Sequence, residues 1–354
     1  MTPRRQLPLL LLPLLLLAAA AGCRSVPQTP SPGTPLPPPL PRPATNAPPA
    51  RTAPPARRTD LPPPPPLRPA ATETQIYAIQ LHLDDANFAP GAIDGHWGPK
   101  TEKAFRAWQL SRRLPPTGTI EDALATPELA ATNDLFETHT VSRADLDALT
   151  PHVATWLEKS RRDRLGHTTL AEALAERYHL SRPALQRLNP TADWPDPPPG
   201  TPVKVLRLRA PRIPSPHHLE IRIAEKTLRV CDAEDRPLAQ FPCSIAADRE
   251  KHNVGATLEI TRCANDPDYT YDPALFDDPE SRASTRRLRI PPGPNNPVGT
   301  AWMGLSLSGY GIHGTPDPEA IGRTESHGCI RLANWDAQRL LRAVRTGLPV
   351  HILP

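Results

Sequence analysis

The residues best suited to chemistry lie close together between Tyr310 and Arg331. His313 and Cys329 are 16 positions apart (329 − 313), and His327 and Arg331 each lie two positions from the cysteine. A thiol with a pKa of about 8.5 is mostly protonated at neutral pH, so it needs a base to become a good nucleophile. An imidazole can be that base, and a guanidinium can bind a carboxylate. The set predicts a Cys–His pair, although spacing alone does not choose between the two histidines.

Short β-strands are predicted to position this stretch. Apolar and polar residues alternate in short runs separated by turn residues, which favours an antiparallel β-sandwich or barrel. Glycine at positions 311, 314 and 328 permits close backbone approaches that a side chain would block. After Arg331, Asn334 is expected to cap a helix. The predicted strands cover residues 218–223, 227–231, 240–246, 256–262 and 302–307.

The element Ser326-His-Gly-Cys-Ile-Arg331, with His313 upstream, resembles the signature of the L,D-transpeptidase (YkuD) family. The resemblance implies a mainly antiparallel, YkuD-like β-sandwich over residues 215–354. It also implies that Cys329 is the nucleophile and His313 the base, with no metal and no organic cofactor. The residues expected to bind substrate or the oxyanion are Ser326, His327, Gly328, Arg331 and Gly314.

In that family reading, Cys329 attacks the amide between the third and fourth residues of a peptidoglycan stem peptide, and D-Ala leaves. An amine of a neighbouring stem, or a lysine of a wall-attached protein, then takes the acyl group. Two alternatives stay open: an L,D-carboxypeptidase or related cysteine hydrolase of the same fold, and a non-catalytic peptidoglycan-binding lipoprotein. A zinc hydrolase is disfavoured because the sequence has no HExxH or HxH element.

The N-terminus resembles a bacterial lipoprotein signal peptide. Arg4 and Arg5 precede an apolar run from Leu7 to Ala21, which is too short to be a membrane span. The run leads to Ala-Ala-Gly-Cys23, so residues 1–22 are expected to be removed and Cys23 lipidated. The protein is therefore expected to be exported to the cell envelope or periplasm and lipid-anchored. The anchor would be in the outer membrane if the cell is Gram-negative, because residue 24 is not Asp.

Residues 23–72 are predicted to be a disordered tether. Nineteen of the 51 prolines of the chain lie between Pro27 and Pro69, among few residues that could build a core. Polyproline geometry rises about 3.1 Å per residue, so the tether could extend on the order of 100 Å. A lipid-anchored body could then work well away from its membrane.

Residues 73–130 resemble the peptidoglycan-binding type 1 module. The matching elements are Asp94-Gly-His-Trp-Gly-Pro-Lys-Thr101 and Leu114-Pro-Pro-Thr-Gly118. Helices are predicted over residues 75–86 and from Pro99, where proline is tolerated in the first turn. Thr101, Ala104, Phe105 and Trp108 share one face of the second helix, and Trp97 and Trp108 are expected to be core residues.

Residues 138–208 resemble a degenerate LysM module. Helices are predicted over 166–180 and 181–188, followed by Leu-Asn-Pro190 and a strand from Pro199 to Leu206. The usual Gly-Asp-Thr-Leu start is replaced by Gly166-His-Thr-Thr-Leu170. The segment is therefore either a glycan-binding module or a linker domain that packs on its neighbour. The whole chain is thus a multidomain protein, with a helical domain and an α+β segment before the β domain.

Composition limits the partners. A net charge of +4 over 354 residues gives no case for nucleic acid binding. The expected partners are peptidoglycan, a membrane through the lipid anchor, and a wall-attached protein as acyl acceptor. Cys231, Cys243 and Cys263 either include one disulfide or are three free thiols. The aromatic-containing insertion 265–289 is a candidate gate for the site.

Overall fold

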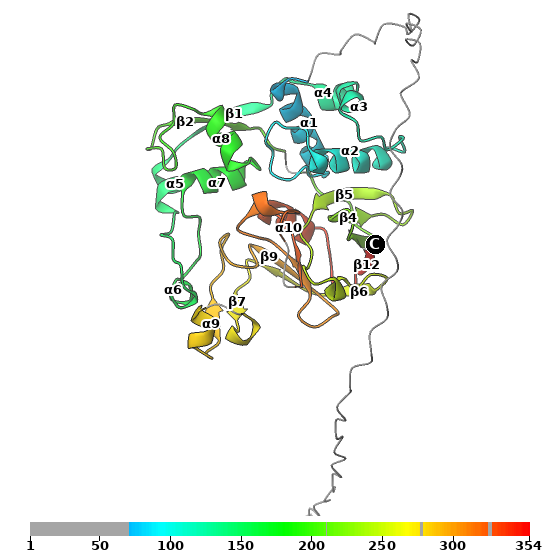
Figure 1. Ribbon diagram of the computed structural model, residues 1–354. Coiled ribbons are helices and arrows are strands. Elements are labelled where there is room, and N and C mark those ends of the chain that lie inside the picture. The colour runs from blue at the N-terminus through cyan, green and yellow to red at the C-terminus, as the bar shows by residue number, and fades with distance from the viewer. Residues whose placement is uncertain (1–70, 210, 277–278, 325–327) are drawn as a thin grey trace, which may run out of the picture. The chain divides into compact units, whose positions relative to one another are not determined.

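A computed structural model describes residues 71–209, 211–276, 279–324 and 328–354 (Figure 1). These residues belong to one compact unit, Leu67–Pro354. The predictions for the signal peptide and Cys23 lie outside the described residues, as do residues 23–70 of the predicted tether and Ser326 and His327, whereas Thr72, at the end of that predicted tether, is the N-cap of α1. Among the described residues, no helix combines the length and the apolar character needed to span a membrane.

The N-terminal segment is helical, as predicted. The Thr72 hydroxyl accepts the Gln75 N–H and starts α1, and a proline at the first position starts α2. The predicted apolar face of α2 is confirmed, since Thr101, Ala104, Phe105 and Trp108 are all buried. The helices are α1 (Glu73–Asp85), α2 (Pro99–Ser111), α3 (Ile120–Leu124) and α4 (Pro127–Ala130).

The next segment has the order strand, helices, strand. Its outer strands β1 and β2 pair antiparallel, and Thr169 and Ser181 cap α7 and α8 through their hydroxyl groups. The two predicted helices and the second strand are present, whereas β1, α5 and α6 were not predicted; LysM identity stays a prediction. The elements are β1 (Phe136–Thr140), α5 (Arg143–Asp147), α6 (Trp156–Ser160), α7 (Leu170–Arg177), α8 (Arg182–Leu188) and β2 (Pro202–Leu206).

The C-terminal domain is a curled sheet of eight strands in the order β11-β10-β9-β6-β12-β3-β4-β5. All neighbours are antiparallel except β10–β11 and β12–β3, so the predicted mainly antiparallel domain is confirmed. The strands are β3 (His218–Arg222), β4 (Thr227–Cys231), β5 (Pro237–Pro242), β6 (Thr257–Asn265), β9 (Ala301–Leu305), β10 (Gly311–His313), β11 (Ile330–Arg331) and β12 (Pro349–Leu353).

The two ends of this sheet meet. Just beyond β5, Ser244 exchanges two backbone hydrogen bonds of 3.0 Å with Arg331 of β11. The sheet therefore closes into a barrel, and the inward residues of alternate positions form one apolar core. We call the Ser244–Arg331 pairing the seam of the barrel.

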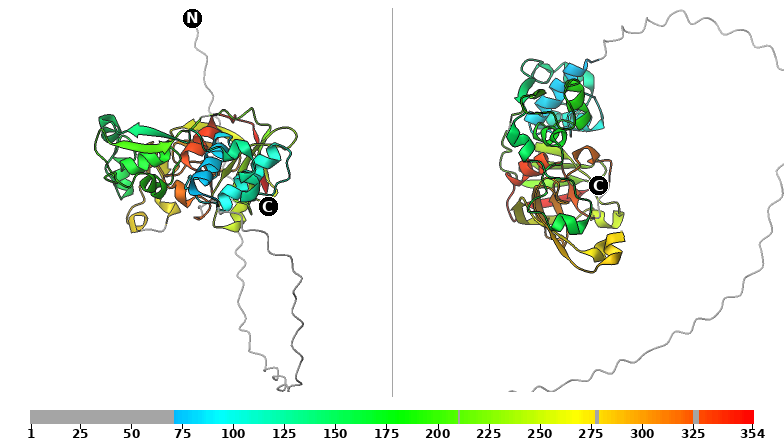
Figure 2. Two further views of the ribbon diagram at one scale, coloured as in Figure 1. Left: turned by 90° about the horizontal axis from the view of Figure 1, so that it is seen from above. Right: turned by 90° about the vertical axis from the view of Figure 1, so that its left-hand side faces the viewer.

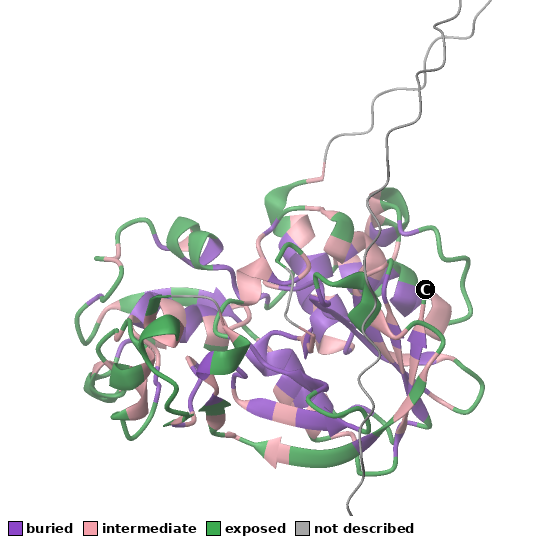
Figure 3. Ribbon diagram, turned by 60° about the horizontal axis from the view of Figure 1, so that its bottom comes forward, coloured by how far each residue is buried: buried purple, intermediate pink, exposed green. Residues whose placement is uncertain are grey.

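Helix α10 (Asn334–Leu341) packs against this core and is buried along most of its length (Figure 3). The prediction that Asn334 caps it is wrong. The N-cap is Ala333, which makes no side-chain cap, and Asn334 is the first helical residue. The Asn334 side chain instead forms hydrogen bonds with Thr300, Glu176 and Pro294, which lie outside the helix. These contacts are described with the candidate active site below.

An insertion between β6 and β9 carries its own small cluster. Trp156 of α6 stacks on Tyr271 with ring centroids 4.3 Å apart, and the Glu280 carboxylate accepts the N–H groups of Trp156 and Leu157. The elements are β7 (Tyr269–Tyr271), η2 (Pro273–Leu275), α9 (Pro279–Ala283) and β8 (Leu288–Ile290), and two further 3₁₀ turns are η1 (Arg249–His252) and η3 (Pro318–Ala320).

Backbone hydrogen bonds join the three segments. The Ala89 N–H donates to the Gln240 carbonyl of β5 at 2.9 Å, and the Ile93 N–H donates to the His179 carbonyl at 2.8 Å. Helix α2 also packs beside β5 (Figure 2). The loop after α1 is thus fastened both to the barrel and to the α+β segment. The four described cysteines are all free thiols.

Candidate active site

Strands β10 and β11 place His313 and Cys329 on neighbouring segments of the sheet. They pair parallel, with Ile312 opposite Ile330 and His313 opposite Arg331. Both isoleucines are fully buried in the barrel core, so His313 and Arg331 lie on the opposite face. Cys329, two residues before Arg331, shares that face. Strand spacing of about 4.8 Å and a rise of about 3.3 Å per residue put the Cα atoms of His313 and Cys329 roughly 8 Å apart, within reach of their side chains.

The orientation of the His313 ring is fixed by two contacts. Its Nδ1 donates to the Gly314 carbonyl at 2.7 Å, which leaves the Nε2 lone pair to accept a proton. One face of the ring stacks on Trp302 of β9, with centroids 5.5 Å apart and planes 22° apart. Burial lowers the pKa of His313 to about 4; the Gly314 bond opposes this and the Arg331 charge adds to it. The imidazole is therefore neutral at pH 7.

The Cys329 thiol is also neutral at rest. Its Sγ donates to the Gly309 carbonyl at 3.5 Å. Burial raises the pKa of the thiol, while a backbone hydrogen bond from Gly311 and the Arg331 charge oppose the rise. The directions of the two pKa shifts thus favour a neutral thiol and a neutral imidazole over a preformed thiolate–imidazolium pair. Proton transfer must accompany attack on a substrate.

The other predicted residues lie around this pair. Arg331 is half-buried, and burial lowers its pKa while the nearby Cys329 opposes that change. A Cβ added to Gly328 would meet only Lys251 Cδ, at 3.7 Å, so one side of this glycine is open to a ligand. Gly314 acts through its carbonyl group on His313. Ser326 and His327 lie outside the described residues.

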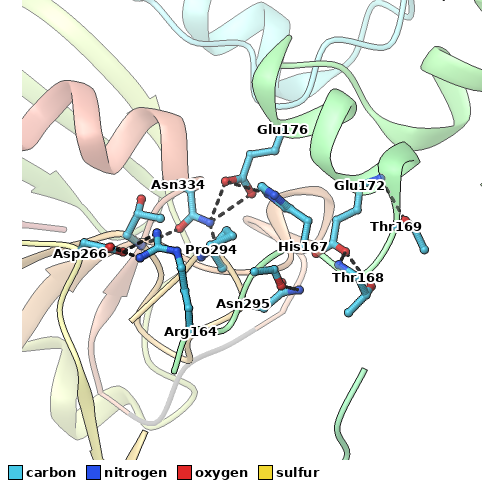
Figure 4. A network of polar contacts seen from close by, with 12 residues as sticks. Arg164, His167, Thr168, Thr169, Glu172, Glu176, Asp266, Pro294, Asn295 and Asn334 are labelled. Carbon is cyan, nitrogen blue, oxygen red and sulfur yellow. Dashed lines mark hydrogen bonds and ion pairs between the residues drawn. The ribbon is translucent and has the colours of Figure 1, made fainter. Parts of the chain in front are cut away.

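Asn334 supports the end of β10 through a polar network (Figure 4). Its Oδ1 accepts the Thr300 N–H at 3.2 Å, and its Nδ2 donates to both carboxylate oxygens of Glu176 at 3.1 Å. A Cβ added to Gly314 would lie 2.2 Å from Asn334 Oδ1, so only glycine fits there. Through Asn334, Glu176 of α7 is connected to the residue that holds His313.

Sequence reasoning missed three contributors. Trp302, Gly309 and Asn334 contact His313, Cys329 and Gly314 respectively. Trp302 was assigned to a strand, but its pairing with His313 depends on the strand register, which a single sequence does not reveal. Among the described residues, three potential metal ligands lie within reach of one ion: His218, Glu220 and Cys231. This group includes neither His313 nor Cys329.

Comparison with known proteins gives two family matches. The L,D-transpeptidase catalytic domain (YkuD) matches residues 216–352, and a peptidoglycan binding domain matches residues 72–124. Both matches cover the segments from which the corresponding resemblance was inferred.

Two sequence relatives agree with the first match. A protein of Bacillus licheniformis named L,D-transpeptidase YkuD is 26% identical over 183 residues, which are 52% of this chain and 93% of that protein. An L,D-transpeptidase of Fuscovulum blasticum is 34% identical over 128 residues, or 36% of this chain and 65% of its own length. A crystal structure of the L,D-transpeptidase from Xylanimonas cellulosilytica is 17% identical, with a TM-score of 0.33, over 82% of this chain and all of that chain.

Proposed function

We propose that this chain, whose residues 216–352 match the L,D-transpeptidase (YkuD) catalytic domain, transfers acyl groups of peptidoglycan stem peptides through a thioester on Cys329. The observation that carries this proposal is the pairing of β10 with β11, which sets Arg331, two residues after Cys329, opposite an imidazole whose Nδ1 is bonded and whose Nε2 can accept a proton. The peptidoglycan binding domain at residues 72–124 supports the choice of substrate.

In the acylation step, Cys329 Sγ attacks the carbonyl carbon of the third stem residue while its proton passes to His313 Nε2. The tetrahedral intermediate then expels the fourth residue, D-Ala, as its C–N bond breaks. The imidazolium returns the proton to the leaving amine, which leaves a thioester on the enzyme. A neutral imidazole at rest suits the first of these transfers, because it can accept the thiol proton.

In the second step an amine attacks the thioester carbonyl. His313 removes a proton from that amine, a new amide forms, and the Cys329 thiolate leaves and is reprotonated. The acceptor amine would come from a diaminopimelate of a neighbouring stem or from a lysine of a wall-attached protein. Water in the same position would give an L,D-carboxypeptidase or hydrolase.

The oxyanion of both steps needs backbone donors. The N–H groups of Gly328 and Cys329, with that of His327, are the proposed set, because the open side of Gly328 lets a carbonyl approach closely. Arg331 is proposed to bind a substrate carboxylate or to fix the site, and Ser326 to orient an imidazole.

Mass spectrometry of the full chain with purified tetrapeptide muropeptides tests the proposal, beside Cys329→Ala and His313→Ala. Dimers linked between two third-position residues, with an acyl adduct on Cys329, are expected only for the parent chain. Tripeptides without dimers would establish the carboxypeptidase instead. Binding to whole sacculi without any adduct or turnover would refute catalysis and leave a peptidoglycan-binding protein.

We also propose export and lipidation at Cys23, followed by the proline-rich tether, which would let the domains work at a distance from the membrane. The support is the Ala-Ala-Gly-Cys23 element after an apolar run. Replacement of Cys23 by Ser should abolish fatty-acid labelling and move the chain from the membrane fraction to the soluble fraction. Unchanged labelling would refute this site. The proposed LysM-like role of residues 138–208 would require binding to glycan chains that lack peptides.

A further inference from the structure

A cavity of about 520 Å³ lies away from the Cys–His pair, in the range of small-ligand sites. Its walls come from the loop after α1 and the start of α2, from α8, from β4 and β5, and from the loop that joins β10 to β11. Neither His313 nor Cys329 lines it. The peptidoglycan binding domain thus forms one wall of a cavity whose opposite wall belongs to the catalytic domain.

The cavity has more cations than its carboxylates can neutralise. It is lined by Lys100, Lys103, Arg187, Lys226 and Arg323, against the carboxylates of Asp94, Glu225 and Glu319. Two of these carboxylates are bound by arginines that do not line the cavity. Glu225 pairs with Arg222 at 2.9 Å and Arg229 at 3.0 Å, and Glu319 pairs with Arg182 at 3.1 Å.

Two lining lysines bond neutral groups. Lys103 Nζ donates to the Glu225 carbonyl at 2.7 Å, and Lys226 Nζ donates to the Gly322 carbonyl at 3.3 Å. These bonds hold the ammonium groups without cancelling their charge. They also fasten the wall of the cavity, because Gly322 belongs to the loop between the two catalytic strands.

Lys100 and Arg323 are the cations best placed for a ligand. In the part of the chain that the structure describes, neither side chain has a hydrogen bond or an ion pair. Burial, and then the Arg323 charge, lower the pKa of Lys100. Asp94 is near, but its Oδ1 already accepts hydrogen bonds from Gln80 and from the His96 N–H. An anion between the two cations would relieve their repulsion.

The Lys100 side chain reaches across to the catalytic loop. A Cβ added to Gly91 would lie 3.0 Å from Lys100 Cδ, and a Cβ added to Gly322 would lie 3.7 Å from its Cε. The stem of Lys100 therefore runs between a glycine of the binding domain and a glycine of the loop. The Gly322 N–H also donates to Ser244 Oγ, the residue that forms the seam with Arg331.

We propose that this cavity is a second, non-catalytic site that binds a carboxylate of a peptidoglycan stem peptide between Lys100 and Arg323. The inference rests on the proposed function, which supplies the substrate class. A stem held here contacts the loop between His313 and Cys329 and leaves the thiol available to another stem. A stem peptide bound in this cavity therefore contacts the same loop that leads from His313 to Cys329.

Calorimetry of the full chain carrying Cys329→Ala tests this site without turnover. The probes are a disaccharide tetrapeptide and the same compound with its carboxylates converted to carboxamides. The parent should bind two equivalents of the acidic probe. Lys100→Gln/Arg323→Gln should weaken one of the two sites at least tenfold, and this difference between the parent and the variant should vanish with the carboxamide probe.

A matched control removes two charges elsewhere. Arg342 and Arg345 are exposed and do not line the cavity, so Arg342→Gln/Arg345→Gln should keep both sites. Equal binding by all three proteins, or undiminished binding of the carboxamide probe, would overturn the inference. Thermal melts of each variant show whether it is folded.

The two proposals fail separately. With Cys329 present, Lys100→Gln/Arg323→Gln should still form the acyl adduct at saturating tetrapeptide. A parent chain that forms no adduct refutes the proposed function, whereas an intact adduct with unchanged binding refutes only the second site.

Discussion

At the scale of single residues, the proposed catalytic pair, Cys329 and His313, is neutral in the free protein. Burial acts in opposite directions on the two pKa values, because it disfavours the charged form of each group. It raises the pKa of the Cys329 thiol and lowers the pKa of His313 to about 4. The thiol therefore persists to higher pH than usual, and the imidazole remains a free base above about pH 4.

This state predicts the pH dependence of alkylation. Modification of Cys329 by iodoacetamide should rise with pH through an apparent pKa above that of an ordinary thiol. Peptide mapping separates Cys329 from the three other described free cysteines. A plateau of rapid labelling below pH 7 would instead show a preformed thiolate. His313→Ala should leave this curve in place but abolish acylation by the tetrapeptide.

Residue types and spacing in the sequence pointed to Cys329 and to a histidine near it, and the family resemblance favoured His313 over His327; the catalytic roles of both residues stay predictions. The sequence was insufficient for Trp302, because the contact with His313 depends on which residues of β9 and β10 face each other. It also misjudged Asn334. An Asn at the start of a helix often caps that helix. Here the Asn334 side chain instead accepts a hydrogen bond from the Thr300 N–H and donates one to the Glu176 carboxylate.

At the scale of elements, the insertion is held by α6 rather than by the barrel alone. The Trp156–Tyr271 stack and the bonds from Trp156 and Leu157 to Glu280 fasten it to the preceding segment. Tyr269 of β7 is close enough to Cys329 for a thiolate there to raise the Tyr269 pKa further, after burial. The insertion is thus near Cys329 and is fixed from outside the catalytic domain.

We expect this insertion to govern access of the acceptor amine. Trp156→Ala should loosen it, and shortening residues 265–289 should remove it, so both should change the ratio of dimer to tripeptide products while the barrel remains folded. Product ratios by chromatography and melting curves give the two readouts. Unchanged ratios in both variants would contradict a gating role, and Leu157→Ala, which retains the stack, serves as control.

Element prediction succeeded where local signals are strong. Hydroxyl caps, Pro99 and a 3.6-residue apolar period mark the helices of the N-terminal segment and α7 and α8. β10 and β11 have only three and two residues. Alternation cannot be recognised over so few positions, so these strands are defined by their neighbours in the sheet. Neither strand was predicted from the sequence.

At the scale of the whole molecule, one buried ion cluster joins the three segments. Asp84 of α1 binds Arg339 of α10 at 3.0 Å and His179, which follows α7, at 2.9 Å. His179 stacks on Trp335, with centroids 5.0 Å apart. Burial alone would raise the pKa of Asp84, but Arg339 and His179 outweigh it and lower that pKa. These partners are up to 255 positions apart, so no local pattern could predict the junction.

Asp84→Ala should lower the free energy of unfolding by about 3–5 kcal/mol, because it leaves the Arg339 guanidinium buried without its partner. Denaturant or thermal unfolding measures the loss. Asp147→Ala breaks only the exposed pair with Arg143 and should cost less than about 1 kcal/mol. Because the Asp84 pKa is lowered, its contribution should persist on acidification below the ordinary carboxyl range. Equal stability of the two variants would show that the junction does not hold the segments.

The seam of the barrel sets the order in which the molecule is assembled. Contacts between residues far apart in the sequence form slowly, because a long loop must close first. The Ser244–Arg331 pairing joins positions that are 87 apart (331 − 244). Strand β11 has only two residues, so it is too short to form without its neighbours in the sheet. Cys329 therefore gains its strand neighbours late in folding. We therefore expect a partly folded chain to carry the Cys329 thiol apart from His313 until the barrel is complete.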